Sequence, residues 1–449
     1  MNKKKLLLIM PDAHMHTLKF GPISMSLREA PLTLTTLAAM VDESKFEIEL
    51  VDESIDSIPL DYKPDIVGIS ILTGTACRGY KIAKHFKAQN IPVIMGGPHV
   101  TVLPDEVEEY ADTIVIGMAE NSWSVVLDDF LLGRLKKRYD DDDKNKSTIL
   151  TVPQPRLDLQ RKSGYTVPNT VQATRGCIHR CDFCSVTALY PKVYQRPIGD
   201  IIRDIKAQSG SRFVFNDVSL VDDVEYVKEL FTAMIPLKKT WGGLATMQVA
   251  QEEELLDIMQ QSGCQFLLVG FESFNQKSLR KIGKGFNRIK EYKQAMERFH
   301  AHGISIQGTM VFGFDDDDTD VFAETVERVQ ELKIDIPRYS IYTPYPGTAL
   351  YKRLERENRI ISKNWEDYDT MHVVYQPTGM SVDELYDGFK WAYKETFKFG
   401  NIIERLEPKM NFNSVINVVG NMTYKLFIHK LYNDPRYAEA NGFVDLRGV

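Results

Sequence analysis

The sequence predicts an α/β protein with two successive series of strands and a helical C-terminal region. Short apolar runs recur between amphipathic helical patterns through the first 130 residues and again from residue 164 to about residue 370. Residues 371–449 carry mainly helical patterns. Alternating strands and helices are typical of parallel sheets covered by helices. A chain of 449 residues with 43% apolar content is large enough for two or three domains of this kind.

The first domain is expected over residues 1–130. Its strands are expected at 5–10, 46–51, 65–71, 92–95 and 113–116, with an amphipathic helix over 76–89. This order predicts a Rossmann-like doubly wound sheet, in which ligands bind beyond the carboxyl ends of the strands.

The turns after the third, fourth and fifth strands of this domain are rich in glycine and small polar residues. They read Ser70-Ile71-Leu72-Thr73-Gly74, Gly96-Gly97-Pro98-His99 and Gly117-Met118-Ala119-Glu120. Paired glycines let a planar ligand lie close to the backbone, and hydroxyl groups can bond its polar edge. The usual dinucleotide motif G-x-G-x-x-G does not follow the first strand.

Residues 131–163 are expected to link the two domains. Basic residues 136–138 and acidic residues 140–143 form opposed charge blocks, and polar and proline residues follow without apolar periodicity. Such a pattern usually indicates a solvated linker. We interpret the acidic run as part of this linker and not as a metal site.

The second domain is expected over residues 164–370, with six strands. They are expected near 172, 212–215, 243–248, 265–270, 305–311 and 338–342. The acidic run 315–318 is interpreted as the start of a helix, favoured by the helix dipole. Thr348 follows a proline-glycine turn and is expected to be a helix N-cap.

The most informative segment is Cys177-Ile178-His179-Arg180-Cys181-Asp182-Phe183-Cys184, which holds three of the five cysteines of the chain. Thiolates are soft ligands that suit zinc, copper(I) and iron–sulfur clusters. Three cysteines leave one position of a four-iron cluster open for a small molecule. The alternatives are a zinc site completed by His179 and a chance group of structural thiols. Cys77 and Cys264 are isolated and are expected to be buried apolar residues.

The C-x3-C-x2-C spacing, with an aromatic residue before the last cysteine, resembles the signature of the radical SAM enzymes. The resemblance implies a partial, six-stranded α/β barrel over residues 164–370. It implies a [4Fe–4S] cluster on Cys177, Cys181 and Cys184, with S-adenosylmethionine (SAM) bound to the open iron. Residues expected to contact SAM lie in this loop and at strand ends: Phe183, Asp217, Gln248, Glu272, Ser273, Gln307 and Gly308. Polar residues at strand ends can also cap the following helices. No catalytic residue is assigned beyond the cofactor ligands.

The turns of the first domain resemble the cobalamin-binding domain that precedes the barrel in one branch of this superfamily. Thr343-Pro344-Tyr345-Pro346-Gly347-Thr348 also resembles that branch, and the pattern is closest to the hopanoid methylases and their relatives. The implied cobalamin contacts are Ser70, Thr73, Gly74, Gly96, Gly97, Pro98, His99, Gly117 and Glu120. The fifth turn keeps only the first and last positions of the usual Gly-Glu-Gly-Glu. The alternative is a degenerate domain that only supports the barrel.

One motif of the cobalamin-binding family is incomplete. Asp12-Ala13-His14 matches the start of the D-x-H-x-x-G pattern, which supplies a lower axial histidine to cobalt. Thr17 stands where the glycine should be. We therefore expect no histidine of this motif on the cobalt.

The resemblance implies a cobalamin-dependent radical SAM enzyme that methylates an unactivated carbon, in a lipid or another secondary metabolite. One alternative is a radical cyclisation, oxidation or rearrangement without methyl transfer, because fold alone does not fix function. A non-catalytic cobalamin-binding regulator is a third hypothesis. The implied partners are a small-molecule or lipid substrate and an electron donor such as flavodoxin or ferredoxin.

Composition bears on compartment and on further partners. A net charge of −7 gives no reason to expect nucleic acid, whose binding domains carry basic faces. No apolar run approaches the 18 or so residues that suggest a membrane-spanning helix, so we expect a cytoplasmic protein. The lysine-rich and aromatic segment 422–432 predicts a C-terminal helix. That helix packs on the barrel or, as the alternative, lies on a membrane surface.

Overall fold

The computed structural model describes residues 3–12, 17–20, 23–59, 61–140, 147–406 and 412–433. The chain divides into two compact units. The first comprises Met1–Gly176 and Ser185–Asn216, and the second comprises Cys177–Cys184 and Asp217–Val449. Each unit is described by itself below.

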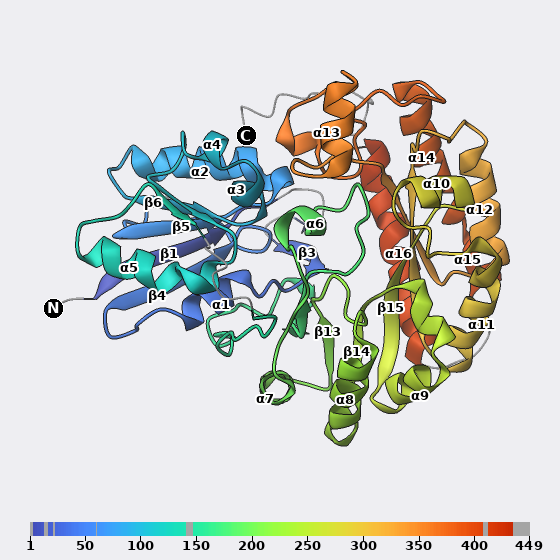
Figure 1. The fold of residues 1–449 in the computed structure, drawn as a ribbon, viewed down its shortest axis with the longest axis horizontal. Coiled ribbons are helices and arrows are strands. Elements are labelled where there is room, and N and C mark those ends of the chain that lie inside the picture. Colours follow the sequence, from blue (N-terminus) through green and yellow to red (C-terminus); the bar gives the residue numbers. More distant parts are fainter. Residues whose placement is uncertain are drawn as a thin grey trace. The chain divides into compact units, whose positions relative to one another are not determined.

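The first unit contains a parallel sheet of six strands in the order β4-β1-β5-β6-β7-β8. These strands are β1 (Lys4–Met10), β4 (Phe46–Asp52), β5 (Ile66–Ser70), β6 (Val93–Gly96), β7 (Thr113–Ile116) and β8 (Arg138–Asp140). Helices α2 (Ala76–Lys87), α3 (Pro98–Val102) and α4 (Pro104–Val107) cover one face, and α1 (Thr33–Ala39) and α5 (Trp123–Leu131) cover the other (Figure 1). The doubly wound sheet predicted from the sequence is confirmed.

Continuous apolar runs explain why the central strands form where they do. Leu6, Leu7, Leu8 and Ile9 are all fully buried in β1, as expected for a parallel strand with helices on both faces. Five of the six strands lie where the sequence predicts them, within one or two residues at each end.

The sixth strand, β8, is a correction to the expected linker 131–163. Arg138 to Asp140 pair with β7, the Tyr139 ring is buried, and its hydroxyl donates to Asp129 (2.8 Å). Arg138 pairs with Asp105 and Glu108 at 2.7 and 2.6 Å. Only one residue of this short edge strand faces the core, so its sequence shows charge and no apolar run. Residues 141–143 of the acidic run lie outside the described residues.

The rest of the first unit consists of short elements. They are β2 (Thr17–Phe20), β3 (Ile23–Glu29) and β9 (Tyr165–Val167) in one small sheet, β11 (Thr174–Arg175) paired with β12 (Tyr194–Gln195), β10 (Thr170–Val171) paired with β13 (Arg212–Phe215), and helices α6 (Val186–Leu189) and α7 (Ile198–Ala207).

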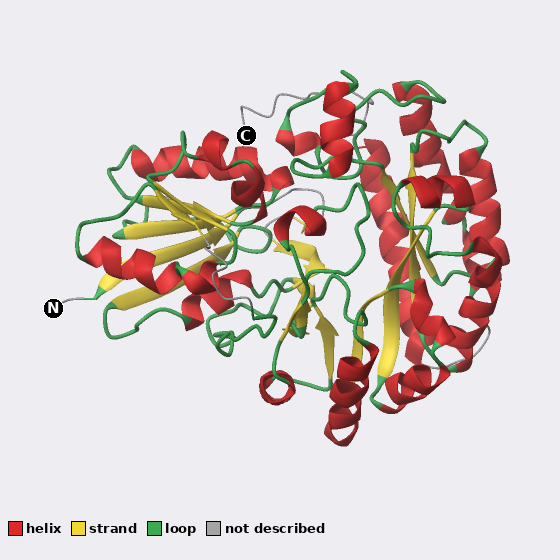
Figure 2. Ribbon diagram, viewed as in Figure 1, coloured by secondary structure: helices red, strands yellow, loops and turns green. Residues whose placement is uncertain are grey.

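The second large sheet has the sequential order β10-β13-β14-β15-β16-β17, so the six expected strands are confirmed (Figure 2). Its strands in the second unit are β14 (Thr240–Ala245), β15 (Cys264–Glu272), β16 (Ser305–Phe312) and β17 (Ile336–Ile341), all parallel. The alternating helices are α8 (Val224–Met234), α9 (Glu253–Gln261), α10 (Gln276–Lys281), α11 (Tyr292–Ala301), α12 (Val321–Glu331) and α13 (Ala349–Arg356).

Three helices follow: α14 (Val382–Thr396), α15 (Phe399–Arg405) and α16 (Phe412–Asn433). In α16, Asn417 donates to Ser305 and Asp335, and Tyr424 accepts from Gln307 on β16 (2.8 Å). The predicted packing of this helix on the barrel is thus confirmed. Among the described residues, no helix has both the length and the apolar character needed to cross a membrane.

Helix α14 packs along β17, the last strand of the sheet. The hydroxyl of Tyr393 accepts the N–H of Tyr339 (3.1 Å) and donates to the carbonyl of the same residue (2.9 Å). Thr396 bonds the Tyr339 hydroxyl (2.7 Å). One side chain therefore satisfies both polar backbone groups of an edge residue.

The acidic run 315–318 is a second correction, because α12 begins only at Val321 and its dipole does not explain the run. Asp315 pairs with two arginines of the α13 region, and Asp316 pairs with two lysines of α10. Asp317 is buried and accepts two backbone N–H groups at 3.0 Å; burial raises its pKa to about 7. Each of these three carboxylates thus has its own structural partners. Thr348 caps α13 as predicted, since its hydroxyl accepts from the N–H of Tyr351 (3.1 Å).

Candidate functional site

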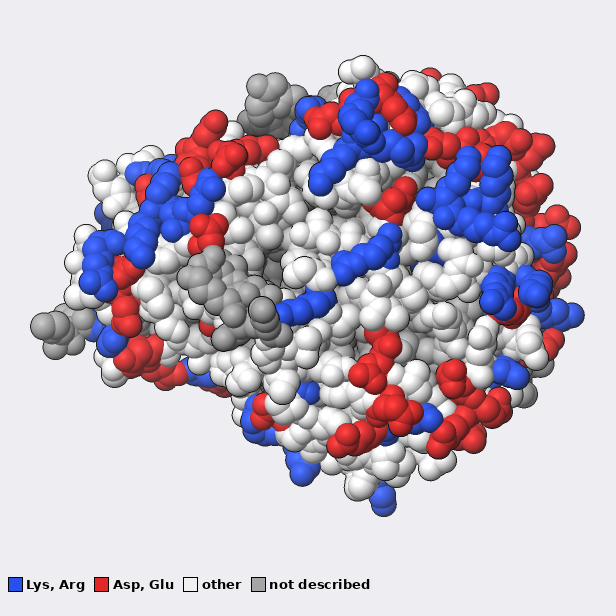
Figure 3. Space-filling view, viewed as in Figure 1, with Lys and Arg blue, Asp and Glu red and all other residues white. Residues whose placement is uncertain are grey.

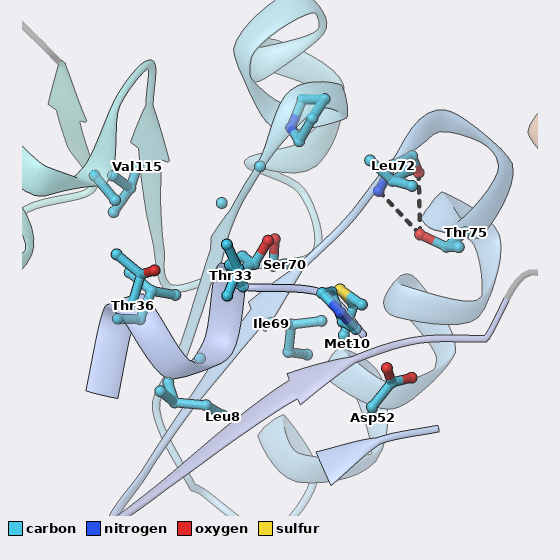
Figure 4. Close-up of a pocket in the computed structure, with 18 of the residues that line it drawn as sticks. Leu8, Met10, Thr33, Thr36, Asp52, Ile69, Ser70, Leu72, Thr75 and Val115 are labelled. Carbon is cyan, nitrogen blue, oxygen red and sulfur yellow. Dashed lines mark hydrogen bonds between the residues drawn. The ribbon is translucent and has the colours of Figure 1, made fainter. Parts of the chain in front are cut away.

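A cavity of about 460 Å³ lies at the carboxyl ends of the strands of the first unit. Met10, Asp52 and Ser70 end β1, β4 and β5 and line it, together with Gly96, which ends β6, and Gly117, which follows β7. Thr33 and Thr36 of α1 line another part of the wall (Figure 4). Ligands of doubly wound sheets bind at this edge, so the cavity is the expected binding site.

The fourth turn approaches this cavity with a backbone that only glycine adopts readily. Gly97 has φ +102° and ψ −177°, and a Cβ placed there would lie 2.7 Å from the carbonyl oxygen of Ile71. The N–H of Ile71 donates to the carbonyl of Gly96 (2.9 Å), which holds the third and fourth turns together. The turn thus presents bare backbone to the cavity.

The structure brings most of the expected cobalamin contacts together, but not all. Those that line the cavity are Ser70, Gly96, Gly97, Pro98, Gly117 and Glu120. Thr73, Gly74 and His99 are not among the lining residues. His99 is fully buried, and its ring bonds the hydroxyls of Thr73 (3.3 Å) and Tyr80 (3.1 Å). His14 lies outside the described residues.

An ion pair that the sequence does not reveal closes part of the cavity wall. Arg175 Nη2 lies 2.6 Å from Glu120 Oε1, and the two side chains are only 15% and 12% exposed. Burial opposes the charge of Glu120, but Arg175 outweighs burial and holds the pKa of Glu120 below its usual range. Tyr190 also lines the cavity, and burial raises its pKa. Arg175 stands two residues before Cys177 in the chain.

The three cysteines of the loop 177–184 lie near one another: after burial, Cys184 also contributes to the raised pKa of Cys177, and Cys184 and Cys177 contribute to that of Cys181. Burial is the main cause at Cys177, followed by the Asp222 carboxylate, and burial raises the pKa of Cys181 to about 12. Cys181 is buried, while Cys177 and Cys184 are partly exposed. Of the other cysteines, Cys264 is buried as predicted and Cys77 is partly exposed. Among the described residues, no three His, Cys, Asp or Glu side chains gather tightly enough for a single metal ion.

The loop is anchored within the second unit. Asp222 accepts from the N–H of Ile178 (2.9 Å), and the N–H of Asp182 donates to the carbonyl of Ile282 (3.0 Å). The Tyr342 hydroxyl donates to Asp182 (2.7 Å), whose pKa burial raises. The backbone is therefore fixed at two points between Cys177 and Cys184.

Side chains of the loop also pack. The His179 ring stacks on Phe286 with ring centroids 3.7 Å apart. Burial lowers the pKa of His179. Phe183 packs edge to face on Tyr342 at 5.8 Å.

At the end of β15, Glu272 forms a nearly buried ion pair with Lys284. Lys284 Nζ lies 2.5 Å from Glu272 Oε1, and the side chains are 12% and 9% exposed. Glu272 has φ +64°, at a point where the register of β15 shifts. Thr309 donates weakly to the same carboxylate (3.4 Å). Lys284 also acts electrostatically on Cys181, so the ion pair lies beside the cysteine loop. No sequence pattern indicates the role of Lys284.

The remaining expected SAM contacts are spread along the second unit. Asp217 and Ser273 are buried, and Ser273 accepts from the N–H of Asn275 (3.0 Å). Gln248 is exposed in the 3-10 turn after β14. Gln307 donates to Tyr424. A Cβ on Gly308 would meet Ile334 at 2.8 Å, so this glycine allows close packing.

The residues of both regions fit the groups that the sequence patterns imply. Three neighbouring thiols of one anchored loop provide the soft donor set that iron–sulfur clusters require. A four-iron cluster is larger than one ion, so its ligands need not converge as tightly. In the first unit, the bare backbone at Gly97 and the small residues around it fit a broad planar ring.

Comparison with known families finds a match in each of these two regions, the cysteine loop with its sheet and the first domain. The profile of the radical SAM superfamily matches residues 171–329, and that of the B12 binding domain matches residues 15–127. A domain of unknown function, DUF4070, matches residues 348–433.

Curated relatives match along most of the chain. Bacteriochlorophyllide d C-12(1)-methyltransferase from Chlorobaculum tepidum is 29% identical over 96% of this chain and 96% of its own length. Hopanoid C-2 methylase from Rhodopseudomonas palustris is 21% identical, covering 74% of this chain and 65% of its own length.

Among solved structures, the radical SAM methyltransferase TsrM from Kitasatospora setae, with cobalamin and a [4Fe–4S] cluster bound, has the same fold. It superposes with a TM-score of 0.65 at 15% identity, covering 96% of this chain and 99% of that one. The cofactors implied for the present chain are cobalamin, SAM and a [4Fe–4S] cluster. The chain is therefore a radical SAM enzyme with a B12-binding domain, homologous to the cobalamin-dependent radical SAM methylases.

Proposed function

We propose that this enzyme transfers a methyl group to an unactivated carbon of a large, mostly apolar small molecule. The cavity at the strand ends of the first unit is the observation that carries the proposal. A radical SAM domain alone would serve many radical reactions, whereas a domain for a methyl carrier in the same chain favours methyl transfer. The cofactors supply the radical and the methyl group, and the chain supplies position and protection from water.

Specific residues carry out this positioning. Cys177, Cys181 and Cys184 would hold the cluster, and their anchored loop fixes its place. Glu272, held by Lys284 at 2.5 Å, would accept hydrogen bonds from an ammonium or ribose hydroxyl of SAM. Holding the reacting groups in a fixed arrangement lowers the entropic part of the barrier.

For the substrate we propose a chlorin-type tetrapyrrole or another molecule of similar breadth and apolarity. The support comes from two relatives named as bacteriochlorophyllide d methyltransferases, each 29% identical to this chain. The hopanoid methylase is 21% identical, so a polycyclic lipid is the second substrate class. Both classes offer unactivated carbons within an apolar framework.

The test is anaerobic reconstitution with iron, sulfide and cobalamin, followed by assay with SAM, a chemical reductant and candidate substrates. We expect retained cobalamin, formation of 5′-deoxyadenosine and a product heavier by one methylene unit. Label from methyl-deuterated SAM should appear in that product. A dehydrogenated or cyclised product without label would favour the alternative radical reactions. Bound cobalamin without any 5′-deoxyadenosine would favour the non-catalytic regulator.

Cysteine variants provide the matched control for this assay. Replacing any one of the three loop cysteines by Ala should abolish SAM cleavage, because each would supply one cluster ligand. Cys77→Ala and Cys264→Ala should retain cleavage and iron content. Equal loss in all five variants would contradict the assignment of the loop.

A further inference from the structure

The segment that follows β15 is the most strongly basic stretch beside the cysteine loop. Residues 276–290 contain six Lys or Arg and no Asp or Glu, in a chain whose net charge is −7. Five of these six side chains belong to exposed residues: Lys277, Arg280, Lys281, Arg288 and Lys290. We call these five residues the α10 basic patch. Figure 3 shows Lys and Arg side chains gathered over α10.

This segment packs directly against the loop that would hold the cluster. The N–H of Asp182 donates to the carbonyl of Ile282 (3.0 Å), one residue after α10 ends. A Cβ on Gly283 would lie 2.9 Å from the carbonyl oxygen of Arg180, so the two backbones touch there. The ring of His179 stacks on Phe286. The segment that carries the α10 basic patch therefore packs directly against the cysteine loop.

The nearby carboxylates neutralise the patch only in part. Lys277 and Lys281 share Asp316, at 2.9 and 2.7 Å, and Arg288 pairs with Glu291 at 3.3 Å. Two carboxylates thus serve three of the five cations, and the patch keeps a positive charge. Lys277 and Arg288 have side chains 70% and 62% exposed. Such a patch attracts and orients an acidic partner.

The chemistry of the enzyme requires an external electron donor. Each SAM cleavage consumes one external electron: the bond between sulfur and the ribosyl carbon breaks, and methionine leaves with an electron pair. The 5′-deoxyadenosyl fragment keeps one unpaired electron. Electron transfer weakens steeply with distance, so the donor must bind near the cluster loop. At this loop Ile178 is 56% exposed and Arg180 is also exposed.

We propose that the α10 basic patch is the docking surface for an acidic one-electron donor of the flavodoxin type. This inference rests on the radical SAM activity proposed above. The donor's flavin hydroquinone is oxidised to the semiquinone as it gives up one electron. The complex is weak and charge-steered, as is usual for electron-transfer encounters.

The test compares two reductants on the reconstituted full-length enzyme. The variant Lys277→Gln/Arg280→Gln/Lys281→Gln removes three positive charges from α10. The control Lys81→Gln/Lys84→Gln/Lys87→Gln removes three from α2 of the first unit. A second variant, Arg280→Glu, leaves both lysine pairs with Asp316 intact. The rate of 5′-deoxyadenosine formation is measured with flavodoxin and its NADPH-dependent reductase, and separately with titanium(III) citrate.

With flavodoxin at low salt, kcat/KM for the donor should fall about tenfold in the triple variant and less in Arg280→Glu. Added salt should slow the wild type and the α2 control but hardly affect the triple variant. Rates with titanium(III) citrate should be equal for all four proteins, because a small reductant needs no docking surface.

Three outcomes would overturn the inference. An unchanged kcat/KM for flavodoxin would mean that the donor docks elsewhere. Equal losses with both reductants would mean that these residues support the fold or the cluster. Absence of 5′-deoxyadenosine from the wild type with titanium(III) citrate would overturn the proposed function, and this inference with it.

Discussion

Gly97 offers a sharp test of the backbone geometry at the cavity. Its φ of +102° with ψ −177° belongs to a region that is essentially restricted to glycine. An added Cβ would lie 2.7 Å from the carbonyl oxygen and 3.0 Å from the nitrogen of Ile71, and these backbone atoms cannot rotate away. Gly97→Ala should therefore cost about 3 kcal/mol in the free energy of unfolding. For a unit of this size, that lowers the melting temperature by about 6–12 °C.

The neighbouring residue supplies the control. A Cβ on Gly96 would meet nothing closer than 3.7 Å, and Gly96 has no positive φ. Gly96→Ala should therefore leave the melting temperature unchanged or slightly raised. Both variants should be measured by calorimetry without cobalamin, because a bound ligand adds its own stabilisation. Equal melting temperatures for the two variants would refute the strained conformation assigned to Gly97.

Two ion pairs, Glu120 with Arg175 and Glu272 with Lys284, give the remaining predictions. Glu120→Gln or Arg175→Met leaves a nearly buried charge unpaired and should lower the free energy of unfolding by about 3 kcal/mol. In a double-mutant cycle measured by denaturant unfolding, the double variant should lose less stability than the two single variants combined. Because Arg175 depresses the folded-state pKa of Glu120, the pair's stabilisation should be present above the unfolded pKa of about 4.3 and disappear as pH falls through the folded value. Acid titrations of wild type and Glu120→Gln check this, and parallel curves would contradict it. Lys284→Met should weaken SAM binding, measured by calorimetry, while the iron content is retained. Lys284→Arg should keep SAM binding close to that of the wild type. Weak binding in Lys284→Arg would show that the shape of Lys284, and not its charge, positions Glu272.

The sequence predicts the sheet strands well because buried parallel strands are continuous apolar runs. Leu6 to Ile9 is such a run, and it lies in β1 as expected. The strand β8 escapes the same reasoning, since Tyr139 alone faces the core between two charged residues. The acidic run 315–318 misleads for a related reason. Local patterns report the preferences of neighbouring residues, whereas Asp315 and Asp316 are held by side chains distant in sequence.

The candidate site also has features that local sequence patterns predict and features that they do not. Glycine turns and clustered cysteines are local signals, and the structure places them at strand ends and in one anchored loop. Within the fourth turn, the sequence cannot tell that Gly97 faces the cavity while His99 turns into the core toward Tyr80. It also cannot pair Glu120 with Arg175, because nothing near either residue indicates its partner.

The hydroxyl of Tyr393 has a consequence for association between molecules. A partial barrel keeps a free edge, and an unsatisfied edge can recruit a strand from another chain. Tyr393 occupies the N–H and the carbonyl of Tyr339 at that edge, so a neighbouring molecule finds no open pair of groups there. A chain truncated before α14 would lose this cover and should self-associate through β17. The C-terminal helices thus help to keep an incompletely closed barrel from adding strands of other chains.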